Sequence, residues 1–186
     1  VDATKGVQYL YETMELVNEG FAEVMKGGPI ADEPCMGVKV RLLDAKLHED
    51  AIHRGPAQTI PAVRNAVYGS MMISKPTLLE PRQKTYVNVP QDLMGDVTRE
   101  FQQRRAVIED IEAEGEAAIV HAVAPVSEMF GFSAAIRSAT GGRAMWSSEM
   151  AGFAPVPDEL EGNIIREIRQ RKGMKEEVPG PAYYAE

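Results

Sequence analysis

The stretch Ala117-Ala-Ile-Val-His-Ala-Val-Ala124 is an apolar run broken only by His121. It is far too short to cross a bilayer, and its length suits a buried strand. Further strand-like segments lie at residues 82–89, 106–111 and 143–150. Helical spacing of apolar residues follows Pro90 and recurs at 132–139. The order β-α-β-β-α-β predicts an α+β fold, a ferredoxin-like plait over residues 77–155.

The preceding residues 1–76 predict an incomplete α/β unit. Apolar residues recur at helical spacing over residues 6–26, and residues 37–47 alternate as a half-buried strand should. A second helix is expected to open with Thr59 as N-cap and Pro61 in the first turn. One strand has unpaired edges, so its partners must come from a missing N-terminal region or from a second copy that swaps strands in a homodimer.

Residues 156–186 form the last expected part of the chain. Pro155 and Pro157 end the plait, and residues 158–172 return to helical spacing with basic side chains near the C-terminal end, where the helix dipole favours them. The tail from Glu176 contains Pro179, Gly180 and Pro181, and we expect it to be irregular or extended.

Composition limits the classes of function. The 186 residues are 44% hydrophobic and carry a net charge of −8, with no signal-peptide pattern, so a cytoplasmic protein without membrane contact is expected. The first residue is Val1, which suggests a fragment or a processed product. Residues 1–36 carry a charge of −5, whereas residues 37–75 carry +3. This basic section permits RNA contact at one place in an acidic chain.

The basic section contains the run His48-Glu-Asp-Ala-Ile-His-Arg-Gly55, a polar loop that cannot bury a core. A zinc motif of the HExxH type would place its histidines four apart, whereas His48 and His53 are five apart with no evident third ligand. We therefore assign no metal ligand and no catalytic residue. A domain that uses His48, Asp50 and His53 for acid-base or metal-dependent catalysis remains the alternative.

Other candidate residues have structural interpretations. Cys35 is the only cysteine, which excludes an internal disulfide and favours a packing role. His121, inside the apolar strand, is expected to be a core-edge histidine that finds a hydrogen bond. The pair Gly141-Gly142 predicts a turn, and no GxxxxGK[ST] phosphate loop occurs.

Several segments resemble one protein family in order along nearly the whole chain. They are TKGVQYL (residues 4–10), HEDAIHRGPAQ (48–58), PVSEMFGFS (125–133), RSATGG (137–142) and RKGMKE (171–176). The chain resembles translation elongation factor 2 of the archaeal type. The resemblance implies the later part of domain IV, of left-handed βαβ type, then domain V, and a C-terminal helix and tail that pack back on domain IV.

The resemblance also implies a function. In that family the whole factor uses GTP to drive translocation of tRNA and mRNA, and the tip of domain IV enters the decoding region of the ribosome. It implies that His53 is the diphthamide position and that the contacts of the tip with RNA come from His48, Glu49, Asp50, Arg54, Gly55 and Gln58. Pro56 and Ala57 stand where eukaryotic members have glycines, which indicates an archaeal member with a stiffer loop.

Cofactors and partners follow from the same resemblance. GTP and Mg²⁺ belong to missing N-terminal domains, so no cofactor and no enzymatic activity are expected in this chain, although its parent is a translational GTPase. The expected partners are the ribosome with its tRNA and mRNA, the diphthamide-synthesis enzymes, and ADP-ribosylating toxins.

Overall fold

The computed structural model describes residues 1–185, apart from the side chain of Glu114. The chain divides into two compact units. Unit 1 comprises Val1–Leu78 together with the residues from Pro157 onward, and unit 2 comprises Leu79–Val156. Within the described part of the chain, every helix is too short or too polar to cross a membrane.

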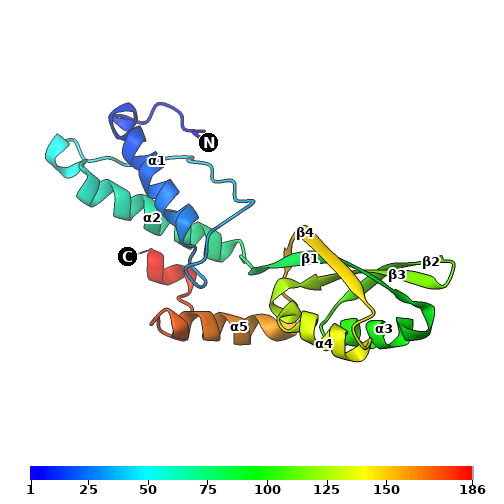
Figure 1. Ribbon diagram of the computed structural model, residues 1–186. Helices are drawn as coiled ribbons and strands as arrows, with labels where there is room; N and C mark the ends of the chain where they lie inside the picture. The colour runs from blue at the N-terminus through cyan, green and yellow to red at the C-terminus, as the bar shows by residue number, and fades with distance from the viewer. Residues whose placement is uncertain (186) are drawn as a thin grey trace. The chain divides into compact units, whose positions relative to one another are not determined.

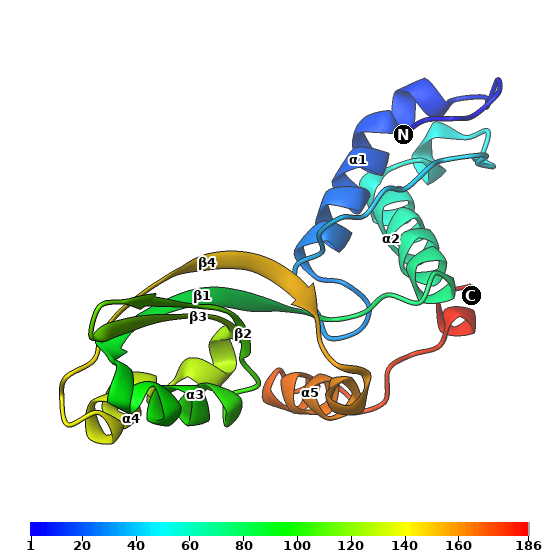
Figure 2. The same cartoon turned by 90° about the vertical axis from the view of Figure 1, so that its right-hand side faces the viewer.

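Unit 2 is a ferredoxin-like plait, which confirms the predicted fold class. Its strands are β1 (Leu79–Pro90), β2 (Val107–Glu114), β3 (Ala117–Pro125) and β4 (Met145–Pro155), and its helices are α3 (Met94–Gln102) and α4 (Phe132–Ala139). The sheet order is β2-β3-β1-β4 with antiparallel neighbours throughout. Both helices cover one face of the sheet and leave the other open (Figures 1 and 2).

The core of unit 2 lies between the sheet and these helices. Alternate residues of the apolar run point into it, so Val120 and Ala122 are fully buried while His121 faces the open side. Phe101 of α3 stacks on Phe132 of α4 with ring centroids 5.2 Å apart. The helix spacing and the strand alternation therefore meet in one hydrophobic cluster.

Several expected boundaries in unit 2 were wrong. β1 begins at Leu79 instead of residue 82. β2 continues to Glu114, and β4 runs from Met145 to Pro155 instead of residues 143–150. β4 is exposed along nearly its whole length, so hydrophobic alternation could not mark its end. A 3-10 turn, Gln91–Leu93, separates Pro90 from α3.

Unit 1 is built around two helices, α1 (Leu10–Lys26) and α2 (Pro56–Ile73). They cross closely at Gly20, where an added Cβ would lie 3.0 Å from the Cβ of Val63. Val24, Val67 and Met71 form a small buried cluster between the helices. A glycine at the crossing thus lets the two backbones approach.

The predicted strand over residues 37–47 was wrong. The segment is extended, but its only ladder contact within residues 1–185 is a parallel bridge between Leu42 and Asp2. Its alternation survives, because Val38, Val40 and Leu42 are half-buried while the residues between them are exposed. A strand needs a neighbour for its N–H and C=O groups, and residues 1–3 supply too little.

Both helix starts in unit 1 also differ from the prediction. α2 begins at Pro56 with Gly55 as N-cap, so Pro61 lies inside the helix. Thr59 is not the N-cap, since its Oγ1 donates to the Arg54 carbonyl at 3.2 Å. α1 begins at Leu10 instead of Gly6, because Tyr9 adopts a left-handed φ of 64° that breaks the helix.

The C-terminal residues complete unit 1. Arg169, in helix α5 (Asp158–Arg171), is only 3% exposed and donates to the carbonyls of Ile30, Lys175 and Glu177 at 2.6–2.9 Å. The tail is not wholly irregular, since Pro181–Tyr184 forms a 3-10 turn (η4) on α2. The basic end of α5 is thus a docking contact as well as a complement to the helix dipole.

Unit 2 allows a direct test of its core. We expect Phe101→Ala to destabilise it by about 3–5 kcal/mol, because the change leaves a cavity beneath the sheet. Urea unfolding followed by fluorescence of Trp146, the only tryptophan, measures the loss within unit 2. Phe130→Ala is the matched control, since Phe130 is 81% exposed and should change stability by less than about 0.5 kcal/mol. Equal losses in both variants would contradict the assigned core.

Candidate functional site

The tip loop, residues 48–55, connects the extended segment to α2 and lies at one end of unit 1 (Figure 1, cyan). His48 Nδ1 accepts a hydrogen bond from the Asp50 N–H at 3.0 Å. The Asp50 carboxylate in turn accepts from the Ile52 N–H at 3.1 Å and caps the 3-10 turn Ala51–His53 (η1). These side chains therefore give the loop a defined backbone of its own.

Arg54 ties this loop to α1. It is 9% exposed, and one guanidinium nitrogen donates to the carbonyls of His48 and Glu49 at 2.7 and 2.6 Å. The other terminal nitrogen pairs with the Glu12 carboxylate at 2.7 Å, and the guanidinium lies 4.1 Å from the centre of the Tyr9 ring. Arg54 is thus occupied by internal contacts that hold the loop closed.

The remaining tip residues are more open. Glu49, Asp50, His53 and Gln58 are exposed, as is His48. The His53 ring packs edge-on against His48 with centroids 4.6 Å apart, and no hydrogen bond within residues 1–185 uses its imidazole nitrogens. Gly55 has a φ of −76°, so its conformation does not require glycine.

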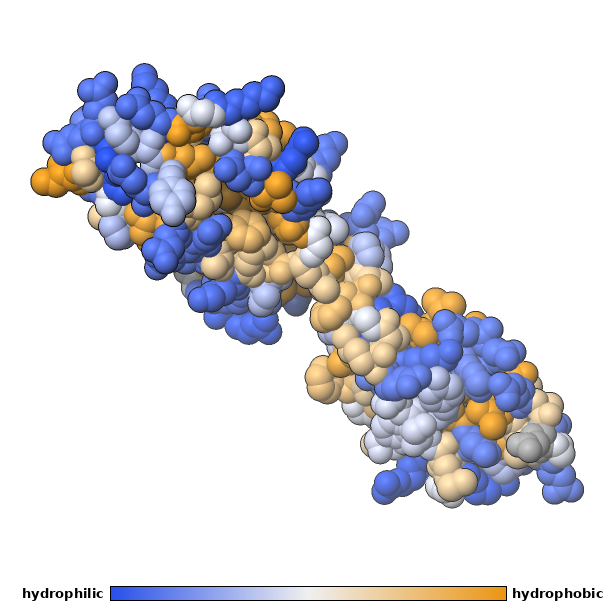
Figure 3. Space-filling model, turned by 90° about the horizontal axis from the view of Figure 1, so that it is seen from above, coloured by the Kyte–Doolittle hydropathy of each residue, from blue (hydrophilic) through white to orange (hydrophobic). Residues whose placement is uncertain are grey.

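The outer surface of the loop is mixed in character. Hydrophobic atoms lie among hydrophilic ones at the left-hand end of Figure 3, and Ile52 is 73% exposed. A loop with an exposed imidazole, an exposed isoleucine and two carboxylates can contact a partner, but it does not enclose a substrate. The geometry therefore suits recognition better than catalysis.

Cys35 offers no nucleophile for the catalytic alternative. Its thiol is half-buried and donates to the Val24 carbonyl at 3.5 Å. Burial raises the pKa of the Cys35 thiol, which keeps it protonated and unreactive at neutral pH. The packing role expected from the sequence agrees with these contacts.

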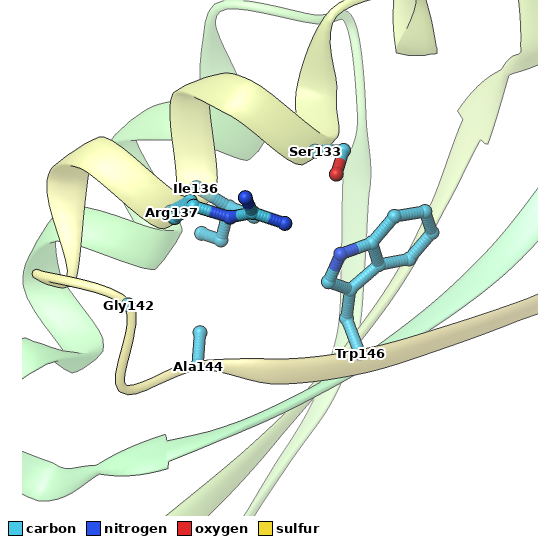
Figure 4. Close-up of a pocket in the computed structure, with 6 residues that line it drawn as sticks. All are labelled: Ser133, Ile136, Arg137, Gly142, Ala144 and Trp146. Atoms are coloured by element: carbon cyan, nitrogen blue, oxygen red, sulfur yellow. The ribbon is translucent and has the colours of Figure 1, made fainter.

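Unit 2 contains a cavity of about 370 Å³ beside α4. The Arg137 guanidinium and the Ser133 hydroxyl from α4 face the Trp146 indole of β4 across it (Figure 4). Gly142 at its rim belongs to the predicted turn, where Gly141 and Gly142 both have positive φ. A cation beside an aromatic ring suits binding, but it provides no acid-base pair.

Sequence reasoning missed two residues of the site, Glu12 and Tyr9. Both lie more than forty positions before Arg54, and nothing local marks them as its partners. Only the return of α2 alongside α1 brings them to the loop.

Comparison with known proteins identifies these units. Residues 1–75 match the family described as elongation factor G, domain IV, and residues 77–164 match elongation factor G C-terminus. The chain is 59% identical to elongation factor 2 of Archaeoglobus fulgidus over 97% of its own length and 25% of the relative's. It is 59% identical to elongation factor 2 of Methanopyrus kandleri over its whole length and 15% of that relative.

A solved structure agrees with this assignment. The structure of a protein from Thermus thermophilus superposes on the chain with a TM-score of 0.74 at 30% sequence identity. The match covers 91% of this chain and 25% of the Thermus protein. The two matched regions are therefore consecutive domains of a translation elongation factor. The chain belongs to the family of elongation factor G and elongation factor 2, and spans about a quarter of the length of the Archaeoglobus relative.

The role of Arg54 in the loop can be tested by hydrogen exchange. We expect Arg54→Ala to speed amide exchange in residues 48–55 roughly tenfold, because two loop carbonyls and Glu12 lose a charge-assisted donor. Arg54→Lys should loosen the loop too, since one ammonium cannot reproduce the guanidinium fork. Arg64→Ala, which removes a half-exposed arginine on α2 that makes no hydrogen bond with the loop carbonyls within residues 1–185, is the control. Unchanged loop exchange in Arg54→Ala would rule out the brace.

Proposed function

We propose that this chain is the ribosome-facing part of a translational GTPase, and that its tip loop contacts RNA in the decoding region during translocation of tRNA and mRNA. The observation that carries the proposal is the exposed His53 on a loop whose backbone is fixed by Arg54. The sequence relatives, which bear the name elongation factor 2, support it.

The loop geometry gives a physical reason for such a role. An element that enters a crowded RNA site gains affinity when its contacts are ordered before binding, because less conformational entropy is lost. The Arg54 brace provides that order, so Arg54 is a positioning residue in this proposal. His48, Glu49, Asp50, Gly55 and Gln58 surround His53 and would make the flanking contacts.

We further propose that His53 is the residue converted to diphthamide. Its imidazole is exposed and takes no part in a hydrogen bond within residues 1–185, whereas His48 Nδ1 already accepts one from the loop backbone. A cationic extension on His53 would reach phosphate oxygens that the short loop cannot. Diphthamide-synthesis enzymes and ADP-ribosylating toxins would then be partners, and GTP with Mg²⁺ would bind domains outside this chain.

The two histidines provide a matched test of the modification. In the factor purified from its native host, we expect intact mass and peptide mapping to find the added group on His53 alone. A His48→Ala variant should still be modified and accept ADP-ribose from diphtheria toxin, whereas His53→Ala should lose both reactions and keep its fold, because its side chain is exposed. Modification of His48, or of neither histidine, would refute the assignment.

A translocation assay separates the RNA contact from the modification. Full-length factor with His53→Ala should translocate more slowly than unmodified factor with His53 intact, if the imidazole itself contacts RNA. Arg54→Ala should impair translocation while the modification persists, because it disorders the loop without removing His53. Wild-type translocation in both variants would contradict an RNA-contacting tip.

A further inference from the structure

Unit 2 brings together three side chains that the proposed function does not use. Asp110 and Glu112 of β2 and His121 of β3 each offer a ligand atom, and these atoms all lie within 4.8 Å of one another. We propose that they form a binding site for a divalent transition-metal ion of the Zn²⁺ class on the open face of the sheet. This site lies outside unit 1 and is independent of the tip loop.

A shift in strand register creates the cluster. β2 pairs Ile108 with Ala122 and then Asp110 with His121, so Glu109 is an extra residue between two steps of β3. If the regular register continued past Ile108, Glu109 would oppose His121, and Asp110 would oppose the buried Val120 on the helix side. The bulge thus turns Asp110 onto the open face.

The register also explains the reach of Glu112. Asp110 lies directly opposite His121, while Glu112 pairs with Ile119 and is a diagonal neighbour of His121. The Glu112 side chain is long enough to reach its diagonal neighbour, and its Oε1 lies 3.5 Å from His121 Nε2. Two ligands of a tetrahedral zinc ion with bonds of about 2.0–2.2 Å stand roughly 3.3 Å apart, so this pair needs little movement.

Charge at the cluster favours a cation. Among residues 1–185, Lys84 pairs with Glu109 at 2.9 Å, but no lysine or arginine pairs with Asp110 or Glu112. Within the described part of the chain, the Asp110 carboxylate accepts one hydrogen bond, from the N–H of its neighbour Ile111 at 2.8 Å. Two carboxylates therefore face one imidazole, and a divalent ion would neutralise both.

The imidazole is held in place for this role. Its ring stands edge-on to Tyr86 with centroids 5.0 Å apart, and the side chain is 17% exposed. Tyr86 is itself fixed by its hydroxyl, which donates to Glu149 at 2.6 Å. The surface of unit 2 at the lower right of Figure 3 is mostly hydrophilic, with scattered hydrophobic residues. An oriented ring nitrogen with two carboxylates selects Zn²⁺, Co²⁺ or Ni²⁺ over Mg²⁺, which prefers oxygen ligands alone.

Calorimetry with the chain tests the site. Titration with ZnCl₂ should show one saturable site per chain, and MgCl₂ should show none. His121→Gln and Glu112→Gln should each weaken Zn²⁺ binding by at least about tenfold, since each removes a ligand. Addition of Co²⁺ or Ni²⁺ should broaden amide NMR signals most strongly in β2 and β3 near His121.

The other possible zinc ligands supply the controls. The double variant His48→Gln/His53→Gln and the variant Cys35→Ser should bind Zn²⁺ as tightly as the parent. Circular dichroism shows whether His121→Gln keeps its fold, and Glu112→Gln tests the site where the side chain is largely exposed. Absent binding, or binding that survives both His121→Gln and Glu112→Gln, would overturn the proposal and leave these charges as protection of the edge strand β2.

Discussion

Arg54 is a charged residue of which only 9% is exposed, so groups around it must compensate for the loss of water at its guanidinium. Removing a cation from water costs several kcal/mol unless hydrogen bonds and an opposite charge compensate. Two loop carbonyls, the Glu12 carboxylate and the Tyr9 ring do so. The donors of a guanidinium point along fixed directions, so satisfying them also fixes the loop that bears His53.

The same solution appears within unit 1, where its C-terminal residues meet the loop that follows α1. Arg169 is buried and donates to three carbonyls, and Lys172 donates to the carbonyls of Ala31 and Asp32. Unit 1 has no β-ladder beyond a single bridge within residues 1–185, so its loops cannot be held by strand pairing. Cationic side chains that donate to backbone carbonyls hold the loops in place of strand pairing, and they leave few polar groups unpaired.

The sequence predicted what depends on local pattern and missed what depends on distant partners. The apolar run around Val120 indicated the plait, and α4 has the expected bounds, because burial on one face leaves a periodic trace. Alternation over residues 37–47 correctly predicted which side chains are half-buried, yet a ladder also needs a neighbouring strand. The exposure of His53 was predictable from the polarity of the loop, but the burial of Arg54 was not, since Glu12 lies in another helix.

The irregular alternation of β2 shows how a weak pattern can carry information. Residues 106–111 alternate less cleanly than the other strands because Glu109 is an extra residue that reverses the face of everything after it. An inserted residue costs a paired step of the ladder, and it persists only where the altered facing is tolerated or useful. Here it moves Asp110 from the helix side to the open face, where it lies opposite His121. The bulge therefore brings Asp110 into the His121 cluster, and an imperfect alternation within a strand indicates where charged groups are brought together.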